Sequence, residues 1–324
     1  MPESLPPTRK RRGRLLRFAA ALVVLCAVAG YLVVQYVTGG TDGPRCKVVS
    51  GSAGGPSYEF TPEQAVNAAT ITAVGTGRGL PERAVAIALA TALQESGLRN
   101  IAHGDRDSLG LFQQRPSQGW GTPREILDPT YAAGEFYRHL VKVRGYQDLP
   151  LTVAAQRVQR SGYPEAYAKH EPDATLLAAA LTGTSAATLT CDGRQDPTQA
   201  TQAAQATATG PDAVRSALVR DFGRDALETT AAEVGAKASP SPTPAPGDGR
   251  TVTLPVRDTG TGSDRGLRER GWQLAHWAVA NSSALRIERV SYAGRQWTAG
   301  STDSAWRTAV GEGGSGSVRI VTAR

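Results

Sequence analysis

Histidine and cysteine are scarce in this sequence, and their spacing excludes the common metal-binding motifs. The 324 residues include four histidines and three cysteines. His103, His139, His170 and His276 show neither the i, i+4 spacing nor the Cys-linked spacing of zinc ligands. No glycine-rich phosphate loop follows an expected strand, and no Ser/His/Asp order suggests a catalytic triad. We therefore expect no metal and no cofactor.

Lysine is also scarce, since only five of the 36 basic residues are lysine, while alanine and glycine abound. This composition is typical of a high-GC bacterial genome. The formal net charge is +7, but the first 17 residues carry six positive charges and one negative charge. That short segment therefore holds +5, and the other 307 residues hold only +2. The basic charge belongs to the N-terminus and does not indicate nucleic-acid binding.

A long apolar run follows the basic segment. Phe18–Val37 has twenty residues, with Gln35 as the only strongly polar one, which is enough to cross a bilayer as a helix. The positive-inside rule then places residues 1–17 in the cytoplasm and the bulk of the chain outside. Cleavage of a signal peptide after Ala29 is the alternative, but it would leave an apolar remnant at the new N-terminus. We expect an uncleaved, single-pass anchor in the cell membrane.

Composition divides the rest of the chain into a tether, a first domain, a linker and a small module. The tether is rich in Gly, Ser and Pro, and the linker is of low complexity with one segment of helical spacing. The last segment resembles short C-terminal modules of exported actinobacterial proteins. The expected segments are a flexible tether at 38–60, a domain at 61–192, a linker at 193–249 with a helix at 211–227, and an α+β module at 250–324.

Two cysteines lie outside the apolar run and bracket the first domain. Exposed regions of secreted proteins rarely keep unpaired thiols, so in an oxidising compartment we expect a disulfide between Cys46 and Cys191. Such a bond would tie the two ends of the domain together. The third cysteine, Cys26, is interpreted as a residue of the span.

Helical signals dominate the first domain. Thr61 followed by Pro62 and Glu63 has the form of a helix cap and a first turn. Apart from a short β-element in the loop after Glu95, no strand pattern is visible there. The last segment contains Trp272, Trp277, Trp297 and Trp306, which we expect in the core rather than stacked on sugars. Expected helices are 65–74, 81–96, 128–143, 151–159, 164–170, 172–181 and 264–281, and expected strands are 285–292, 295–299 and 317–323.

The helix at 81–96 carries the residue that we expect to be catalytic, Glu95. Pro81 suits the first turn of a helix, and Gly97 suits the left-handed position just after its end. Glu95 lies in line with small residues, which leave room for a ligand. A carboxyl in the last turn faces the negative end of the helix dipole, which favours the protonated form that a general acid needs.

The segments after this glutamate resemble those of lysozyme-like lytic transglycosylases. That family has Glu-Ser on a helix followed by a Gly-Leu-Met-Gln element, and this sequence has Glu95-Ser96-Gly97 followed by Gly110-Leu111-Phe112-Gln113. Gly104-Asp105-Arg106 is similar to the Gly-Asp-Arg of goose-type lysozymes. Asp128–Gly134 is similar to the family's Asp-Pro helix start. The resemblance implies a mainly α lysozyme-like domain that cleaves β-1,4 glycosidic bonds of peptidoglycan, with Glu95 as general acid and base.

Two departures from the family leave the reaction type open. Arg115 stands where goose-type lysozymes have a further aspartate, and Ala154-Ala155-Gln156 stands where transglycosylases have Ala-Tyr-Asn. A hydrolase needs a second carboxylate, for which Asp105 is the first candidate and Asp107 the second, whereas a transglycosylase needs only one. A non-catalytic domain that binds the cell wall or acts as a scaffold is the alternative. Expected substrate contacts are Ser96, Gln113, Gln114, Trp120 and Tyr163, with Tyr167 a weaker candidate.

Overall fold

The capping signals in the sequence correspond to helix ends in the computed structural model, which describes residues 44–52, 54–163, 165–193, 210–223, 249–256, 264–300, 305–309 and 314–323. Helix α2 (Pro62–Gly77) begins after Thr61, whose hydroxyl accepts from the Gln64 backbone while the Gln64 side chain accepts from the Thr61 backbone. Helix α3 (Glu82–Ser96) begins after Pro81 and ends at Gly97, which has a left-handed φ of 62°. Both predicted boundaries are confirmed.

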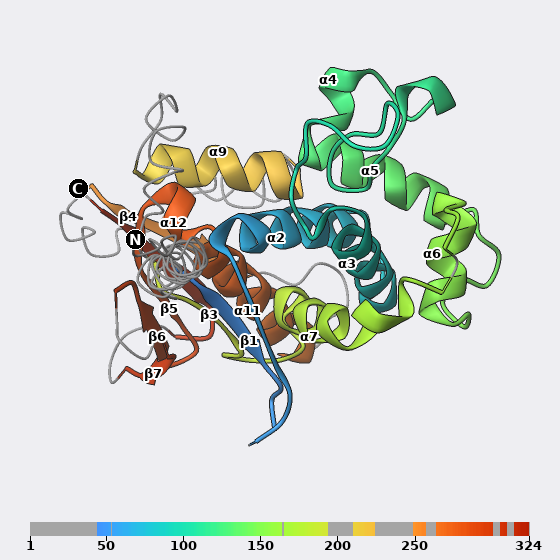
Figure 1. Ribbon diagram of the computed structural model, residues 1–324. Coiled ribbons are helices and arrows are strands. Elements are labelled where there is room, and N and C mark those ends of the chain that lie inside the picture. Colours follow the sequence, from blue (N-terminus) through green and yellow to red (C-terminus); the bar gives the residue numbers. More distant parts are fainter. Residues whose placement is uncertain are drawn as a thin grey trace, which may run out of the picture. The chain divides into compact units, whose positions relative to one another are not determined.

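Along the described chain, two strands precede a run of helices from α2 to α7, and most of the remaining strands follow α11 and α12 near the C-terminus (Figure 1). The other helices are α4 (Pro123–Ile126), α5 (Pro129–Leu140), α6 (Leu151–Gln159), α7 (Glu171–Thr182), α9 (Pro211–Phe222), α11 (Asp264–Ala280) and α12 (Ser282–Leu285), with 3-10 turns η1 (Pro116–Gln118) and η2 (Ala168–His170). The strands are β1 (Cys46–Val49), β2 (Ser57–Phe60), β3 (Leu189–Cys191), β4 (Thr251–Pro255), β5 (Ile287–Tyr292), β6 (Arg295–Thr298), β7 (Arg307–Thr308) and β8 (Ser317–Thr322). The expected helix at 164–170 is reduced to the 3-10 turn η2.

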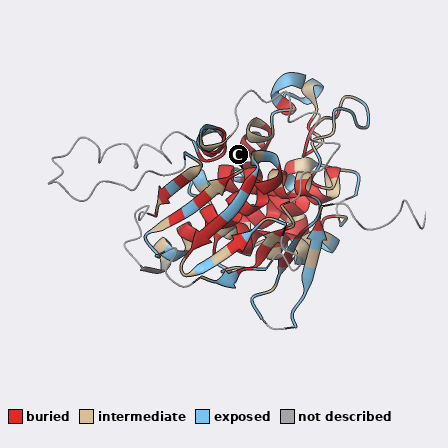
Figure 2. Cartoon of the chain, turned by 90° about the vertical axis from the view of Figure 1, so that its left-hand side faces the viewer, coloured by how far each residue is buried: buried red, intermediate tan, exposed pale blue. Residues whose placement is uncertain are grey.

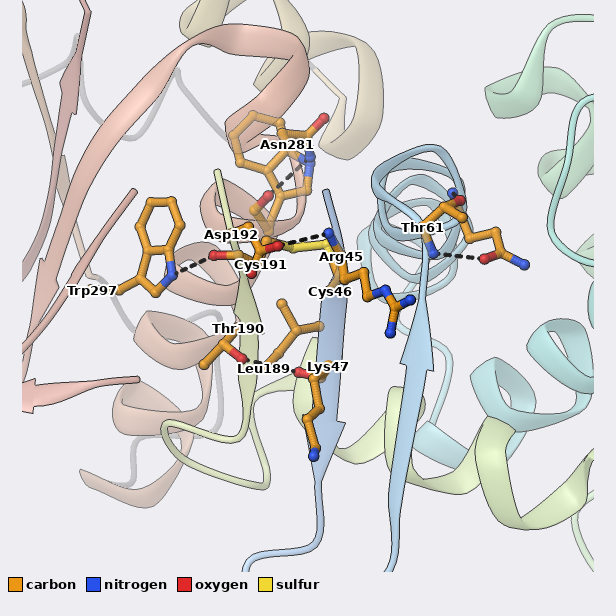
Figure 3. The surroundings of a disulfide bond; sticks show 12 residues. Arg45, Cys46, Lys47, Thr61, Leu189, Thr190, Cys191, Asp192, Asn281 and Trp297 are labelled. Carbon is orange, nitrogen blue, oxygen red and sulfur yellow. Dashed lines mark hydrogen bonds between the residues drawn. A yellow bond between two sulfur atoms is a disulfide. The ribbon is translucent and has the colours of Figure 1, made fainter. Parts of the chain in front are cut away.

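A three-stranded antiparallel sheet brings the two ends of the first domain together, in the order β2-β1-β3. Cys46 lies directly opposite Cys191 in this sheet, and the two form the predicted disulfide, which spans 145 residues of sequence (Figure 3). The indole of Trp297 donates to the Cys191 carbonyl over 3.1 Å, so the C-terminal part of the chain also contacts this sheet. The expected flexible tether at 38–60 is wrong for β1 and β2, because their backbone groups are paired within the sheet.

The second sheet has five antiparallel strands in the order β4-β8-β5-β6-β7. Helix α11 contacts β5 and β8 of this sheet as well as α7 and α2 of the first domain. Residues 271–280 of α11 are all buried, as expected for a helix surrounded by other elements. Buried residues form a single core that helices and strands share, and Figure 2 shows it in red. The four C-terminal tryptophans are buried in this core, as predicted.

The expected fold class is therefore wrong, because the described chain is a mixed α/β structure with two antiparallel sheets rather than a mainly α domain followed by a small module. The described residues from Pro44 onward belong to one compact unit. Among the described residues, no helix combines the length and the apolar character needed to cross a membrane. The proposed span at Phe18–Val37 lies outside the residues that the structure describes.

Candidate functional site

Glu95 lies in the last turn of α3, and its carboxylate is held by a residue far away in the sequence. The hydroxyl of Tyr167, just before η2, donates to Oε1 of Glu95 over 2.7 Å. Glu95 is half-buried and Tyr167 is fully buried. Burial is the main cause that raises the pKa of the Tyr167 phenol far above its usual value, and the Glu95 carboxylate raises it further. Tyr167 is therefore a hydrogen-bond donor at any neutral pH.

The small residues that were expected to leave room for a ligand on α3 do not do so. Ala84, Ala88 and Thr91 have no exposed surface, and the Thr91 hydroxyl donates to the Ile87 carbonyl in its own helix. Protein atoms thus cover this face of the helix along most of its length. Any ligand has to reach Glu95 at the C-terminal end of α3, where the chain enters the loop that contains Gly110–Gln113.

Ser96 fixes this loop to the end of α3. Its hydroxyl lies 2.8 Å from the Leu111 carbonyl and 3.1 Å from the Ala92 carbonyl, and the residue is buried. The carbonyl of Phe112, which follows Leu111, accepts from the side-chain amide of Gln159 at the end of α6 over 2.8 Å. Ser96 was expected to contact substrate, but its buried hydroxyl instead joins the loop to the helix. The Gly-Leu-Phe-Gln element is thereby held beside Glu95 from two sides.

Gln113 is the residue of this element that keeps an accessible side chain. It is half-buried with a φ of 47°, and its amide nitrogen donates to the Gly110 carbonyl over 3.2 Å. Gly104 lies directly against this amide, so closely that a Cβ atom at position 104 would overlap the Gln113 amide oxygen. The absence of a side chain at Gly104, in the Gly-Asp-Arg segment, therefore leaves room for the Gln113 amide. This placement is compatible with the expected contact between Gln113 and a glycan.

The two candidates for a second carboxylate are placed differently, and neither is a hydrogen-bond partner of Glu95 in the described part of the chain. Asp107 is held by the Arg115 guanidinium at 2.6 Å and by the Ser117 backbone N–H at 2.9 Å. The hydrogen bonds from Ser117 and Arg115 lower the Asp107 pKa far below its usual value. A carboxylate that stays ionised in this way cannot exchange a proton near neutral pH. Asp105 has a side chain that is 94% exposed, and it lies 3.9 Å from Arg106.

Three of the expected substrate contacts take other positions. Gln114 is 2% exposed and donates its amide to the Ala132 carbonyl over 3.0 Å, so it cannot contact a glycan. Trp120 stacks on His139 with ring centroids 4.3 Å apart and packs against the core, which leaves it half-buried. Tyr163 is 79% exposed, and the structure gives it no contact with Glu95. The tyrosine that does contact Glu95 is Tyr167, which the sequence favoured less.

The segment between α6 and η2 supports Tyr167 through a short network. Gln156 and Ser161 exchange two hydrogen bonds, of 2.8 and 2.9 Å, and Ser161 has a side-chain hydrogen bond with Tyr167. Gln156 belongs to the run that stands in place of the Ala-Tyr-Asn element. Gln156 is therefore linked to Tyr167 through Ser161 and forms no hydrogen bond with Glu95. No local pattern in the sequence identifies these partners, because Tyr167 and Glu95 are 72 positions apart.

Within the described ranges, no group of three or more His, Cys, Asp or Glu side chains is arranged to hold a metal ion. The arrangement at Glu95 is instead suited to proton transfer. One carboxylate oxygen is anchored by Tyr167, and Oε2 has no hydrogen-bond partner among the residues that the structure describes. A half-buried carboxyl with one anchored and one unoccupied oxygen is suited to give a proton to a ligand and to take it back.

Comparison with known families bears on the C-terminal part of the chain. A family described as "VldE, C-terminal domain" matches residues 213–317, which extend from α9 to the first residue of β8. The match covers less than half of the chain and includes neither Glu95 nor the loop after it. No curated protein matches the chain. The matched segment includes α11, which packs on α7 and α2, so it is part of the framework on which α3 is held.

Proposed function

We propose that this protein cleaves β-1,4 glycosidic bonds of peptidoglycan glycan strands, with Glu95 as the general acid and base. The observation that carries the proposal is the anchoring of Oε1 by Tyr167, next to a loop that presents Gln113. The resemblance of Glu95-Ser96 and Gly110–Gln113 to the lytic transglycosylases supplies the substrate class. The Cys46–Cys191 disulfide supports an oxidising, extracytoplasmic location, where this substrate lies.

The reaction needs only one carboxylate if it follows the transglycosylase route. Glu95 protonates the oxygen of the leaving sugar as the glycosidic bond breaks. The C6 hydroxyl of the same muramic acid then attacks its C1 and returns a proton to Glu95, so that a 1,6-anhydro ring closes and no water is consumed. The state of Asp107 favours this route over hydrolysis by a pair that includes Asp107, since its hydrogen bonds from Arg115 and Ser117 make it a poor base for an attacking water.

The test is the release of soluble fragments from purified peptidoglycan by the wild-type protein and by Glu95→Gln. The introduced amide keeps an oxygen that can accept from Tyr167, so the variant should fold normally but lack the proton. We expect the rate to fall on the order of 100-fold to 10,000-fold. Glu165→Gln is the matched control, because Glu165 is an exposed glutamate two positions before Tyr167. A wild-type protein that sediments with the wall but releases no fragments would support the wall-binding alternative.

A further inference from the structure

A pocket of about 410 Å³ lies where α2, the α4–α5 junction and α9 meet. Its lining includes two arginines from different elements, Arg124 on α4 and Arg220 on α9. The polar residues Asn67 and Thr70 of α2 and Asp128 at the start of α5 complete the polar part of the lining. None of these residues belongs to the arrangement around Glu95. The pocket is therefore a separate feature that needs its own explanation.

Arg220 is held in place by a buried carboxylate. Its Nε donates to Oδ1 of Asp221 over 2.8 Å, and the Asp221 side chain has no exposed surface. Oδ2 of Asp221 accepts from the Trp277 indole at 2.8 Å and from the Thr70 hydroxyl at 3.3 Å. These bonds join α9, α11 and α2. The guanidinium of Arg220 therefore reaches the pocket already oriented, which lowers the entropy lost when it binds a ligand.

Arg124 supplies a second cation that has no other function in the described structure. It lies on α4, whose start is fixed by reciprocal hydrogen bonds between Thr122 and Glu125. Arg124 is exposed, and within the described ranges it forms no ion pair and no side-chain hydrogen bond. An unpaired arginine on a fixed helix beside a pocket is a good partner for an oxyanion, because the guanidinium can donate two parallel hydrogen bonds.

Asp128 is the acidic residue that lines the pocket, and its carboxylate also caps the start of helix α5. Its Oδ1 accepts from the backbone N–H groups of Thr130 and Tyr131 at the start of α5. The positive end of the α5 dipole lies at the same place. Asp221 balances the charge of Arg220, but it has no exposed surface and does not line the pocket. The pocket therefore offers the N–H donors of two guanidinium groups, of which Arg124 is unpaired within the described residues, beside one capped carboxylate.

We propose that this pocket binds a small molecule through an oxyanion, held between the guanidinium groups of Arg124 and Arg220. A carboxylate and a phosphate group share this chemistry. The proposal does not depend on the reaction at Glu95, because no residue is common to the two sites.

The test is calorimetric titration of the full chain with inorganic phosphate and, separately, with sodium acetate, at constant ionic strength. Preferential binding of phosphate would identify a phosphate ligand, and preferential binding of acetate a carboxylate ligand. Binding of neither anion would overturn the proposal.

Two variants with opposite expected effects make the test specific. Arg124→Gln should weaken binding about tenfold, because one charge-assisted hydrogen-bonding group is lost. Asp128→Asn should strengthen binding severalfold, since asparagine keeps the helix cap but removes the negative charge. Arg144→Gln, at another exposed arginine, is the matched control and should bind as the wild type does. Equal losses in Arg124→Gln and Arg144→Gln, or weaker binding by Asp128→Asn, would overturn the proposal.

Discussion

The Tyr167 hydroxyl donates to Oε1 of Glu95 over 2.7 Å, although the two residues are 72 positions apart in the sequence. The bond joins the end of α3 to the segment that leads into η2. It fixes one oxygen of the carboxylate and leaves the other without a hydrogen-bond partner among the described residues. The predictions that concern the proposed reaction follow from this relationship.

Removal of the Tyr167 hydroxyl should slow the reaction without abolishing it. Tyr167→Phe keeps the buried ring but leaves Oε1 without its donor, so we expect peptidoglycan cleavage to fall about tenfold. Because the Tyr167 pKa is raised, the phenol stays protonated and the bond persists at every pH below the usual tyrosine value. Ionisation of the Tyr167 phenol should therefore not contribute to the pH dependence of cleavage between about pH 5 and pH 9. Tyr163→Phe is the matched control, because Tyr163 is 79% exposed, and a similar loss in both variants would contradict the assignment.

A methyl group at position 104 should affect activity through Gln113. In Gly104→Ala the new Cβ has to displace the Gln113 amide, which we expect to contact the glycan. The rate of cleavage should fall severalfold, while the melting temperature changes little because Gly104 is exposed. Gly162→Ala is the control, since a Cβ there meets no atom within 4 Å. A full rate in Gly104→Ala would show that the position of Gln113 does not matter for the reaction.

Acid should destabilise the fold through His276. This residue has no exposed surface, its Nδ1 donates to the Ala180 carbonyl at 2.7 Å, and its Nε2 has no partner among the described residues. Burial lowers the His276 pKa to about 4, against an ordinary value of 6.5. Neutral His276 is therefore fully compatible with folding above about pH 6.5. The free energy of unfolding should fall by roughly 3 kcal/mol in all as the pH falls towards 4, because the unfolded chain binds the proton more readily.

His276→Asn isolates this contribution, because the asparagine amide can still donate to the Ala180 carbonyl. Urea unfolding at a series of pH values measures the free energy of unfolding of both proteins. The wild type should lose more stability than the variant between about pH 7 and pH 4. Equal losses would mean that other groups cause the acid sensitivity.

The Cys46–Cys191 bond should contribute strongly to stability, because it closes a loop of 145 residues. In the chain-entropy description, loss of a bond that closes so long a loop costs about 4–5 kcal/mol. Paired Cys46→Ser and Cys191→Ser substitutions should lower the melting temperature by several degrees. Cys26→Ser leaves the pair intact and should melt as the wild type does. A double variant with unchanged melting temperature would show that the three-stranded sheet alone holds the two ends together.

Features of the fold that depend on neighbouring residues could be predicted from the sequence. The cap at Thr61 and the end of α3 at Gly97 follow from local hydrogen bonding and backbone preference. The short β-element in the loop is present as the bridge between Leu109 and Gln114. In contrast, β1 and β2 are four-residue strands around a Gly/Ser-rich turn, and β1 pairs with β3, which lies more than 100 residues away. Nothing in the local pattern of a short strand specifies so distant a partner.

At the site, too, residue types could be predicted from the local sequence, whereas burial and long-range partners could not. Glu95 and Gln113 keep partly accessible side chains, whereas Ser96 and Gln114 have a similar polarity but are buried by packing. Exposure of a polar residue depends on the elements packed around it, and the sequence pattern does not contain that information. For the same reason, the sequence favoured Tyr163 over Tyr167, although it is Tyr167 that contacts Glu95.

The most direct test of the central claim is mass spectrometry of the fragments that the protein releases from peptidoglycan in ¹⁸O-labelled water. If Glu95 acts as the single carboxylate, the wild type should release fragments with 1,6-anhydro ends and without ¹⁸O, Asp105→Asn should give the same products, and Glu95→Gln should release almost none. Incorporation of ¹⁸O at new reducing ends, lost in Asp105→Asn, would show a hydrolase with two carboxylates. Unchanged release by Glu95→Gln would contradict the account altogether.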